Sequence, residues 1–113
     1  MYELIEKKSR FIGYAATVSS ETEAKNFIDG IACEHKRTQH IAFAYIVPGA
    51  TRFSDAGEPR GTAGLPLFNS IYRRGLENTV VVVVRYYGGI HLGKGGLMRA
   101  YGKTAGGALD SIL

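Results

Sequence analysis

Five consecutive valines, Val80 to Val84, constrain the fold of this chain more than any other feature of its sequence. A half-exposed strand alternates apolar and polar side chains, whereas an unbroken β-branched run is typical of a strand covered on both faces. Arg85, Tyr86 and Tyr87 then bring polar atoms to the end of the run. We therefore expect a buried strand with polar side chains at its C-terminal end.

A glycine-rich segment and a helical pattern follow this strand. Five glycines fall within nine positions, and Lys94 lies among them: Gly88, Gly89, Gly93, Gly95 and Gly96. Apolar side chains then recur every three or four residues, which predicts one face of a helix. These residues are Leu97, Tyr101, Ala105, Ala108 and Ile112. Three more glycines within this helix predict that it lies very close to the sheet or to another backbone, because each costs about 1 kcal/mol relative to alanine.

The rest of the chain predicts three further strands and two further helices. Ser20 followed by Glu23 is a capping box, which marks the start of the first helix. Thr62 is the expected N-cap of the second helix, and Gly75 is its expected stop. The predicted strands cover residues 9–18, 40–47 and 51–54, and the helices run from residue 20 to about 36 and from 62 or 63 to about 74.

Apolar spacing also predicts which faces are buried. Ala42 and Ala44 share one face of their strand, where a helix can pack closely. Cys33 has apolar neighbours and is expected to be a buried structural thiol rather than a nucleophile. The predicted core residues are Ala24, Phe27, Ile28 and Ile31 in the first helix and Leu65, Phe68 and Ile71 in the second. The order β-α-β-(β)-α-β-α predicts an α+β or α/β sandwich with helices against one sheet.

Length and composition limit the class of protein. A chain of 113 residues, 45% hydrophobic and 21% charged, is typical of one globular domain. No apolar run approaches the roughly 18 residues needed to span a membrane, and the first residues do not resemble a secretion signal. The single cysteine cannot form an internal disulfide. These features favour the cytoplasm and give no indication of a membrane partner.

Positive charge is concentrated in the part of the chain that holds the glycines. The net charge is +4; residues 1–35 carry four basic and six acidic side chains, whereas residues 36–113 carry ten basic and four acidic ones. A basic surface attracts phosphate-bearing partners, although the same excess also serves solubility alone.

Two glycine-rich loops, residues 57–64 and 88–96, each precede a predicted helix start. Bare backbone N–H groups at such a start form an anion site, so we predict a shared phosphate cradle for RNA or a nucleotide. The alternative is that the glycines only permit positive-φ turns and tight packing. The candidate binding residues are Arg60, Gly61, Thr62, Arg85, Gly88, Gly89, Gly93, Lys94, Gly95, Gly96 and Arg99. Tyr86 and Tyr101 are candidates for stacking on bases, unless they belong to the core.

Catalytic and cofactor motifs find little support. The loop GGIHLGKGG matches neither the phosphate loop of NTPases nor the dinucleotide loop, and the three histidines lack metal-ligand spacing. No metal and no cofactor are therefore expected. Asp55 and Glu58 form a possible acidic pair for acid–base chemistry. The alternative is that they cap turns or pair with Arg60.

Three segments resemble the signatures of the YigZ/IMPACT family of uncharacterised proteins. They are KKSRFIGYAATVSSETEA at residues 7–24, SDAGEPRGTAGLPLF at 54–68 and VVVVRYYGGIHLGKGGLMRAYGKTAGGAL at 81–109. The resemblance implies a single IMPACT N-terminal-like domain over residues 1–113, with an α+β two-layer sandwich of the ribosomal protein S-five domain-two-like type. Bacterial relatives in this family usually carry a second, ferredoxin-like domain, and the resemblance implies only the first domain over these 113 residues.

The resemblance also implies a function. The family's domain is proposed to bind nucleic acid or ribosomal partners, and eukaryotic relatives regulate translation by competing for a ribosome-associated activator of a stress kinase. Our leading hypothesis is therefore a non-catalytic domain that binds RNA or a ribosome-associated protein in the translation machinery. A protein-interaction module that binds a translation-stress regulator and a phosphate- or nucleotide-binding enzyme are the alternatives.

This sequence departs from the family pattern at two places. The family often has two aspartates before Gly-Glu-Pro, whereas Asp55 is followed here by Ala56. It often has His-Asn-Cys in the strand that begins at His40, where this chain has Ile41 and Ala42. Both changes remove polar groups near the proposed cradle, so they weaken a catalytic interpretation more than they weaken binding.

Overall fold

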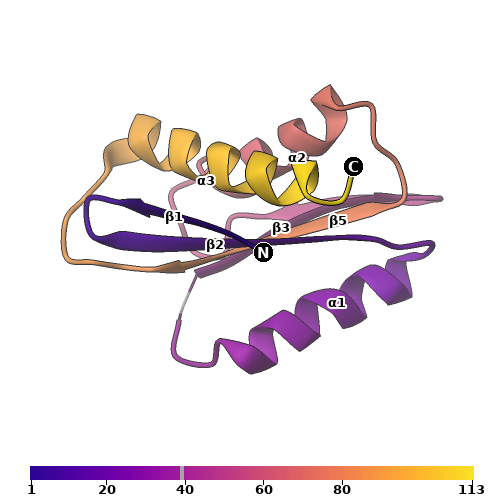
Figure 1. The fold of residues 1–113 in the computed structure, drawn as a ribbon, viewed down its shortest axis with the longest axis horizontal. Helices are drawn as coiled ribbons and strands as arrows, with labels where there is room; N and C mark the ends of the chain where they lie inside the picture. Colours follow the sequence, from indigo (N-terminus) through magenta and orange to yellow (C-terminus); the bar gives the residue numbers. More distant parts are fainter. Residues whose placement is uncertain (39) are drawn as a thin grey trace.

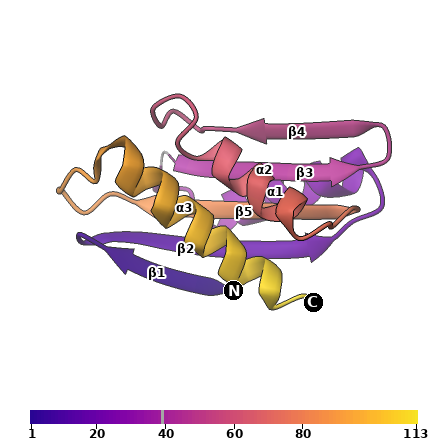
Figure 2. The same cartoon turned by 90° about the horizontal axis from the view of Figure 1, so that it is seen from above.

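The valine run forms the central strand of a five-stranded antiparallel sheet with the order β1-β2-β5-β3-β4 (Figure 2). The computed structural model describes residues 1–38 and 40–113. Its strands are β1 (Tyr2–Glu6), β2 (Ser9–Thr17), β3 (His40–Val47), β4 (Ala50–Ser54) and β5 (Thr79–Tyr86), and its helices are α1 (Glu21–Glu34), α2 (Gly64–Arg73) and α3 (Gly93–Asp110). Val80 to Val84 are all 0% exposed, which confirms the expected burial of this strand.

Helices cover both faces of the sheet (Figure 1). Val81 and Val83 face α2 and α3, where they join the larger core cluster. Val80, Val82 and Val84 point the other way and pack with the apolar stripe of α1. The α+β class is confirmed: the sheet with α2 and α3 forms the expected pair of layers, and α1 adds cover on the opposite face.

Strand β3 alternates as its sequence predicted. Ala42 and Ala44 are fully buried in the cluster that contains α2, and Tyr45 and Val47 lie in the cluster that contains α1. Small side chains on one face allow α2 to approach the sheet closely. The same closeness recurs at Gly13 of β2, where an added Cβ would stand 2.8 Å from the carbonyl oxygen of Thr104 in α3. The close approach of α3 to the sheet is therefore present, but it is made at Gly13, whereas Gly102, Gly106 and Gly107 of α3 face the side chains of Pro66, Arg74 and Tyr2.

Strand β1 is the one strand that sequence patterns did not predict. It pairs with β2 along its whole length, from Tyr2 opposite Gly13 to Glu6 opposite Ser9. The connecting turn places Lys7 and Lys8 at φ values of 46° and 65°, a left-handed conformation that lysine seldom adopts. Because the turn contains no glycine, proline or asparagine, it carries no ordinary turn signal. The ring of Tyr2 packs against Gly107 of α3. A Cβ added at Gly107 would stand 2.3 Å from that ring, so the absence of a side chain at this position makes room for Tyr2.

The phase of α2 differs from the prediction. The helix begins at Gly64 with Ala63 as its N-cap, and no side chain of the cap residue bonds to it. Of the predicted stripe, Ile71 is buried and Phe68 is partly buried against the core, whereas Leu65 is not; the buried residues of α2 are Gly64, Pro66, Leu67, Ser70 and Ile71. Leu65 is 36% exposed, because the core face follows the four-residue spacing from Leu67 to Ile71. Gly75 does end this helix region, with φ at +64°.

Helix α1 confirms its predicted start. The Ser20 hydroxyl accepts a hydrogen bond from the Glu23 amide at 3.2 Å, and Ala24, Ile28 and Ile31 are buried. Cys33 is exposed, so the prediction of a buried thiol was wrong. Its position on the helix lies two residues beyond Ile31 and therefore turns away from the buried stripe.

Among the described residues, no helix is long and apolar enough to cross a membrane.

Candidate functional site

The two glycine-rich segments line a single cleft of about 810 Å³. The cleft lies where β3 begins, β5 ends and α3 starts, so it combines residues that are distant in sequence. It is lined by Arg37, Thr38, His40, Gly57–Pro59, Arg85–Tyr87, His91–Lys94 and Leu97. The two loops therefore do lie together, as the cradle hypothesis requires, but they differ in what they offer to a ligand.

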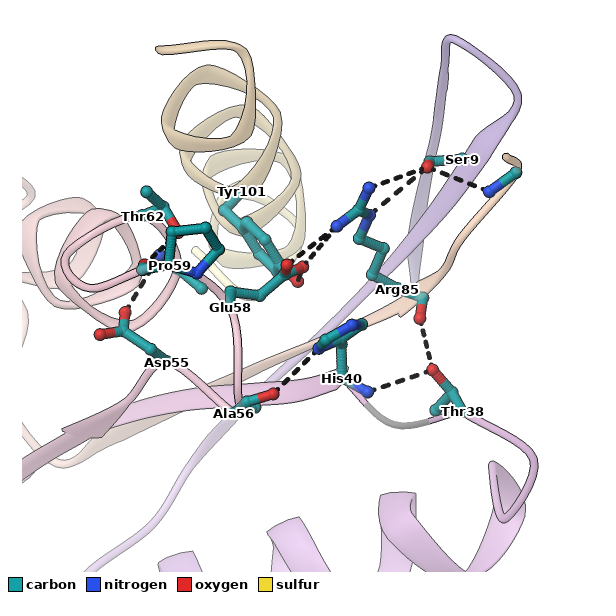
Figure 3. Close-up of polar contacts among 12 residues, drawn as sticks. Ser9, Thr38, His40, Asp55, Ala56, Glu58, Pro59, Thr62, Arg85 and Tyr101 are labelled. Atoms are coloured by element: carbon teal, nitrogen blue, oxygen red, sulfur yellow. Dashed lines mark hydrogen bonds and ion pairs between the residues drawn. The ribbon is translucent and has the colours of Figure 1, made fainter. Parts of the chain in front are cut away.

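The floor of the cleft is a buried ion pair (Figure 3). Arg85 Nη1 donates to both carboxylate oxygens of Glu58, at 2.9 and 2.8 Å. Its Nε and Nη2 donate to the Ser9 hydroxyl at 3.4 and 3.3 Å. Arg85 is 5% and Glu58 8% exposed. Because the charge of Arg85 is neutralised inside the protein, this residue is not the free phosphate-binding cation that the sequence suggested.

Tyr101 completes this network from α3. Its hydroxyl donates to Glu58, and its ring meets that of Phe11 edge-on, with centroids 5.1 Å apart. Burial first, and then the hydrogen bond to Glu58, raise the pKa of the phenol, so Tyr101 stays protonated as a donor. Its side chain is 0% exposed. Tyr101 therefore cannot stack on a base, and the alternative assignment to the core applies.

In the first loop, the carboxylate of Asp55 occupies the position at the start of α2 where an external anion would bind. One carboxylate oxygen accepts from the Gly61 amide at 3.0 Å, and the other from the amides of Ala63 and Gly64 at 3.2 and 2.9 Å. These are the amides that an external phosphate would need at the start of α2. Burial alone would raise the pKa of Asp55, but the three amide bonds and the nearby charge of Arg60 outweigh it and lower the pKa.

Other predicted residues of the first loop have structural roles. Thr62 is buried, and its hydroxyl donates to the Pro59 carbonyl at 2.5 Å. Gly61 has φ at +79°, which only glycine adopts readily, and Arg60 is exposed beside Asp55. Asp55 and Glu58 do not form an acidic pair with each other, because one binds backbone amides and the other binds Arg85. Neither carboxylate is therefore free for acid–base work.

The second loop remains open at the start of α3. Leu92 is the N-cap residue, and no side chain caps the helix. Gly93, Lys94 and Gly95 are exposed, and the first two line the cleft. Gly89 and Gly93 have φ values of +87° and +73°, so they also serve the turn. These residues keep the predicted arrangement of a basic side chain beside a glycine-lined opening.

Three members of the predicted cradle lie elsewhere. Gly88 packs on the backbone of Lys8 and donates its amide to the Ser9 hydroxyl at 3.3 Å. Gly96 lines a second depression of about 230 Å³ beside Lys7. Arg99 also lines that depression and does not line the cleft, although its guanidinium lies beside Gly95 at the start of α3. The cradle is therefore smaller than the sequence predicted.

Arg99 belongs instead to a basic groove of about 410 Å³ between α2 and α3. Arg73 of α2 and Lys103 of α3 line the same groove, and Lys103 also reaches the depression beside Lys7. Arg74 lines the groove too but is paired with Asp110 at 2.9 Å. We call Lys7, Arg73, Arg99 and Lys103 the basic row. Within residues 1–38 and 40–113, none of its members has an acidic partner.

Several residues of the cleft had no sequence signal that marked them together. Arg37, His40, Tyr87 and His91 come from separate segments, and only the fold brings them to one cavity. His40 Nδ1 lies 2.9 Å from the Ala56 carbonyl. Because a carbonyl only accepts, Nδ1 carries the proton, and Nε2 of neutral His40 is an acceptor.

Over the described part of the chain, no group of three His, Cys, Asp or Glu side chains is arranged to hold a metal ion.

Tyr86 differs from Tyr101 because it lines the cleft and its side chain packs on the α1 side of the sheet. Its hydroxyl bonds to His35 Nδ1 at 2.6 Å, and His35 Nε2 bonds to the Tyr14 hydroxyl at 2.8 Å. This chain of three rings ties the end of α1 to strands β2 and β5. Tyr86 is half-buried and is one of the residues that line the cleft, but its ring packs with the α1-side cluster, so a stacking role stays a prediction.

Comparison with known proteins identifies the family. A family model described as the Impact N-terminal domain matches residues 7–109. The chain belongs to this family. "IMPACT family member YvyE" of Bacillus subtilis is 43% identical over 114 residues, which cover 98% of this chain and 52% of that protein. "IMPACT family member YigZ" of Escherichia coli is 43% identical over 111 residues, covering 94% and 54% of the two chains.

A solved structure confirms the fold of this IMPACT domain. The crystal structure of a hypothetical protein superposes with a TM-score of 0.89 at 40% identity, over 96% of this chain and 56% of the other. The resemblance that the three sequence segments indicated is thereby confirmed as family membership. This chain spans about half the length of the relatives that it matches.

Proposed function

We propose that this IMPACT domain is a non-catalytic binding domain that holds single-stranded RNA of the translation machinery in the cytoplasm. The basic row carries the proposal. Arg73, Arg99 and Lys103 line one groove, and Lys7 extends the positive surface toward the start of α3. A groove lined by exposed cations on two helices suits a phosphate backbone, which presents negative charge at regular intervals.

The distribution of acidic side chains supports the same proposal. Glu58 and Asp55 are used inside the protein, and Asp110 is paired with Arg74 at the far end of the groove. Glu6 lines the depression together with Lys7, Arg99 and Lys103, but it forms no ion pair with them within residues 1–38 and 40–113, so the basic row keeps a net positive charge toward solvent. Arg85, which the sequence placed among the phosphate ligands, takes no part in this proposal because Glu58 neutralises it.

The test is the salt dependence of RNA binding. We expect a labelled single-stranded RNA with a 5′-hydroxyl end to bind at low salt, with an affinity that falls as salt rises. Each phosphate contact contributes about 0.7 to the slope of log K against log salt for single strands, so Arg99→Gln with Lys103→Gln lowers the slope by about 1.4. Fluorescence anisotropy over a salt series measures both quantities.

A matched control lies on the other side of the molecule. Lys25 of α1 and Lys36 just after it are exposed, and α1 covers the opposite face of the sheet. Lys25→Gln with Lys36→Gln removes the same charge but leaves the slope nearly unchanged. Absence of RNA binding by the wild type at low salt, or equal slopes for the two double variants, contradicts the proposal.

A protein-interaction module is a second candidate, favoured by one observation. Phe53 of β4 and Tyr72 of α2 are 48% and 69% exposed, and Phe68 packs between them with ring centroids 5.6 and 5.8 Å away. Exposed aromatic rings are enriched where proteins bind one another. Pull-down of a ribosome-associated protein that survives nuclease treatment and is lost in Tyr72→Ala supports this function.

A further inference from the structure

We propose that the cleft between β5 and α3 binds a nucleoside monophosphate group, either as a free nucleotide or as the 5′-terminal nucleotide of an RNA. The cleft is distinct from the basic groove, since none of its lining residues lines that groove. Its volume of about 810 Å³ falls within the range of small-molecule sites. The inference therefore goes beyond backbone binding and is tested separately from it.

The charges around the cleft select an anion. Lys94 and Arg37 stand on its lining, and neither has an acidic partner among residues 1–38 and 40–113. Glu58 is the only carboxylate among the lining residues, and Arg85 neutralises it with two hydrogen bonds. A ligand in this cleft therefore meets a net positive field, which suits a phosphate group.

The aromatic lining selects a planar ring. Tyr87 is 50% exposed, and the Arg85 guanidinium lies 5.3 Å from its ring centroid. The His91 ring is tilted beside it, with centroids 5.7 Å apart. These contacts hold Tyr87 at the cleft while half of its surface stays open. A nucleobase stacks readily on such a ring, because each base presents an aromatic face.

Two further residues of the cleft lining, His40 and Thr38, bring polar groups to it. The carbonyl of Ala56 holds His40 through Nδ1, and the ring lines the cleft with Nε2 as its remaining hydrogen-bonding atom. Thr38 is fixed by donating to the Arg85 carbonyl. The floor beneath them is rigid, since Arg85 is bonded to both Glu58 and Ser9. A preformed site of this kind keeps the ordering cost of binding low.

Isothermal titration calorimetry with AMP, adenosine and inorganic phosphate tests the proposal. We expect saturable AMP binding, with adenosine and phosphate each at least about ten-fold weaker, because each lacks one of the two recognised parts. Tyr87→Ala weakens AMP about ten-fold and leaves the response to phosphate unchanged. Lys94→Gln weakens both AMP and phosphate. Circular dichroism of each variant verifies that the domain is folded.

The groove variants separate this inference from the proposed function. Arg99→Gln with Lys103→Gln leaves AMP binding unchanged, and Tyr87→Ala leaves the salt slope for 5′-hydroxyl RNA unchanged. Competition with AMP then distinguishes the two sources of the ligand. A 5′-phosphorylated RNA that displaces AMP more tightly than its 5′-hydroxyl counterpart identifies an RNA end, and that version rests on the proposed function. Equal, weak competition by both RNAs identifies a free nucleotide.

Three results overturn the inference. They are absence of AMP binding at millimolar concentration, equal affinity for AMP and inorganic phosphate, and full AMP affinity in folded Tyr87→Ala and Lys94→Gln variants. The second result would mean that the cleft collects anions without recognising a nucleoside.

Discussion

At the scale of single residues, Asp55 shows how a side chain can occupy a site that appears open in the sequence. Its two oxygens accept three backbone N–H groups at the start of α2. A carboxylate at a helix start also interacts favourably with the helix dipole. The glycines that follow Asp55 let the loop curl around its side chain, so they support an internal anion rather than an external one.

We expect Asp55→Ala to lower the free energy of unfolding by about 1–2 kcal/mol near neutral pH, the usual cost of losing a helix cap. The folded pKa of Asp55 lies below its unfolded value of about 3.9. Its stabilisation is therefore fully present above that value and is lost as the pH falls through the folded pKa. Urea denaturation at about pH 7 and about pH 3 measures both effects.

Asp29→Ala provides the control for this prediction. Asp29 is an exposed residue of α1, and its replacement is expected to change the free energy of unfolding by less than about 0.5 kcal/mol. A difference between the wild type and Asp55→Ala that is as large at low pH as at neutral pH would show that ionised Asp55 does not supply the stabilisation.

At the scale of elements, the contact between β2 and α3 sets how deeply α3 sits on the sheet. Gly13 of β2 faces the Thr104 carbonyl, and the hypothetical Cβ would also stand 3.1 Å from the Ala108 methyl carbon. The Thr104 hydroxyl donates to the Ala100 carbonyl of its own helix at 2.7 Å, and this hydrogen bond holds the Thr104 side chain in place. The missing side chain at Gly13 thus makes room for a rigid neighbour.

Gly13→Ala is expected to lower the free energy of unfolding by about 1–3 kcal/mol, because overpacking forces α3 away from the sheet. Gly30→Ala is the matched substitution in open space: Gly30 lies within α1, and no atom comes within 4 Å of its added Cβ. That variant should gain up to about 1 kcal/mol from helix propensity. Equal changes in the two urea midpoints would refute the close contact.

At the scale of the whole molecule, the buried network around Arg85 connects four separate parts of the chain. Arg85 is in β5, Ser9 begins β2, Glu58 lies in the loop before α2, and Tyr101 comes from α3. Figure 3 shows the side chains of Ser9, Glu58, Arg85 and Tyr101 converging from these parts of the chain. The network therefore fixes the relative positions of the elements that form the proposed nucleotide site.

We expect Glu58→Gln to lower the free energy of unfolding by about 3–5 kcal/mol, because it leaves the buried Arg85 charge without a partner. The double variant Glu58→Leu with Arg85→Met removes both charges and should recover most of that loss. Denaturant titrations of the two variants measure the difference. A double variant that is no more stable than Glu58→Gln would indicate that the pair's hydrogen bonds, rather than its charges, hold the domain together.

Local patterns in the sequence determined much of the fold. The valine run indicated a strand covered on both faces, Ser20 and Glu23 indicated the start of α1, and Ala42 with Ala44 indicated a face against which a helix packs. Each of these features depends on residues close together in the chain, where periodicity and capping act. Strand β1 and the phase of α2 escaped prediction because edge pairing and docking against the sheet decide them.

The sequence by itself therefore indicated every element except β1, the burial of the valine strand and the presence of two glycine-rich loops beside positive charge. Only the tertiary structure decided which charges remain available. Arg85 is neutralised by Glu58, the first loop is closed by Asp55, and Arg99 lies in a different groove. The physical reason is that charge pairing depends on distances of a few ångströms between segments far apart in the chain, and residue spacing does not encode those distances.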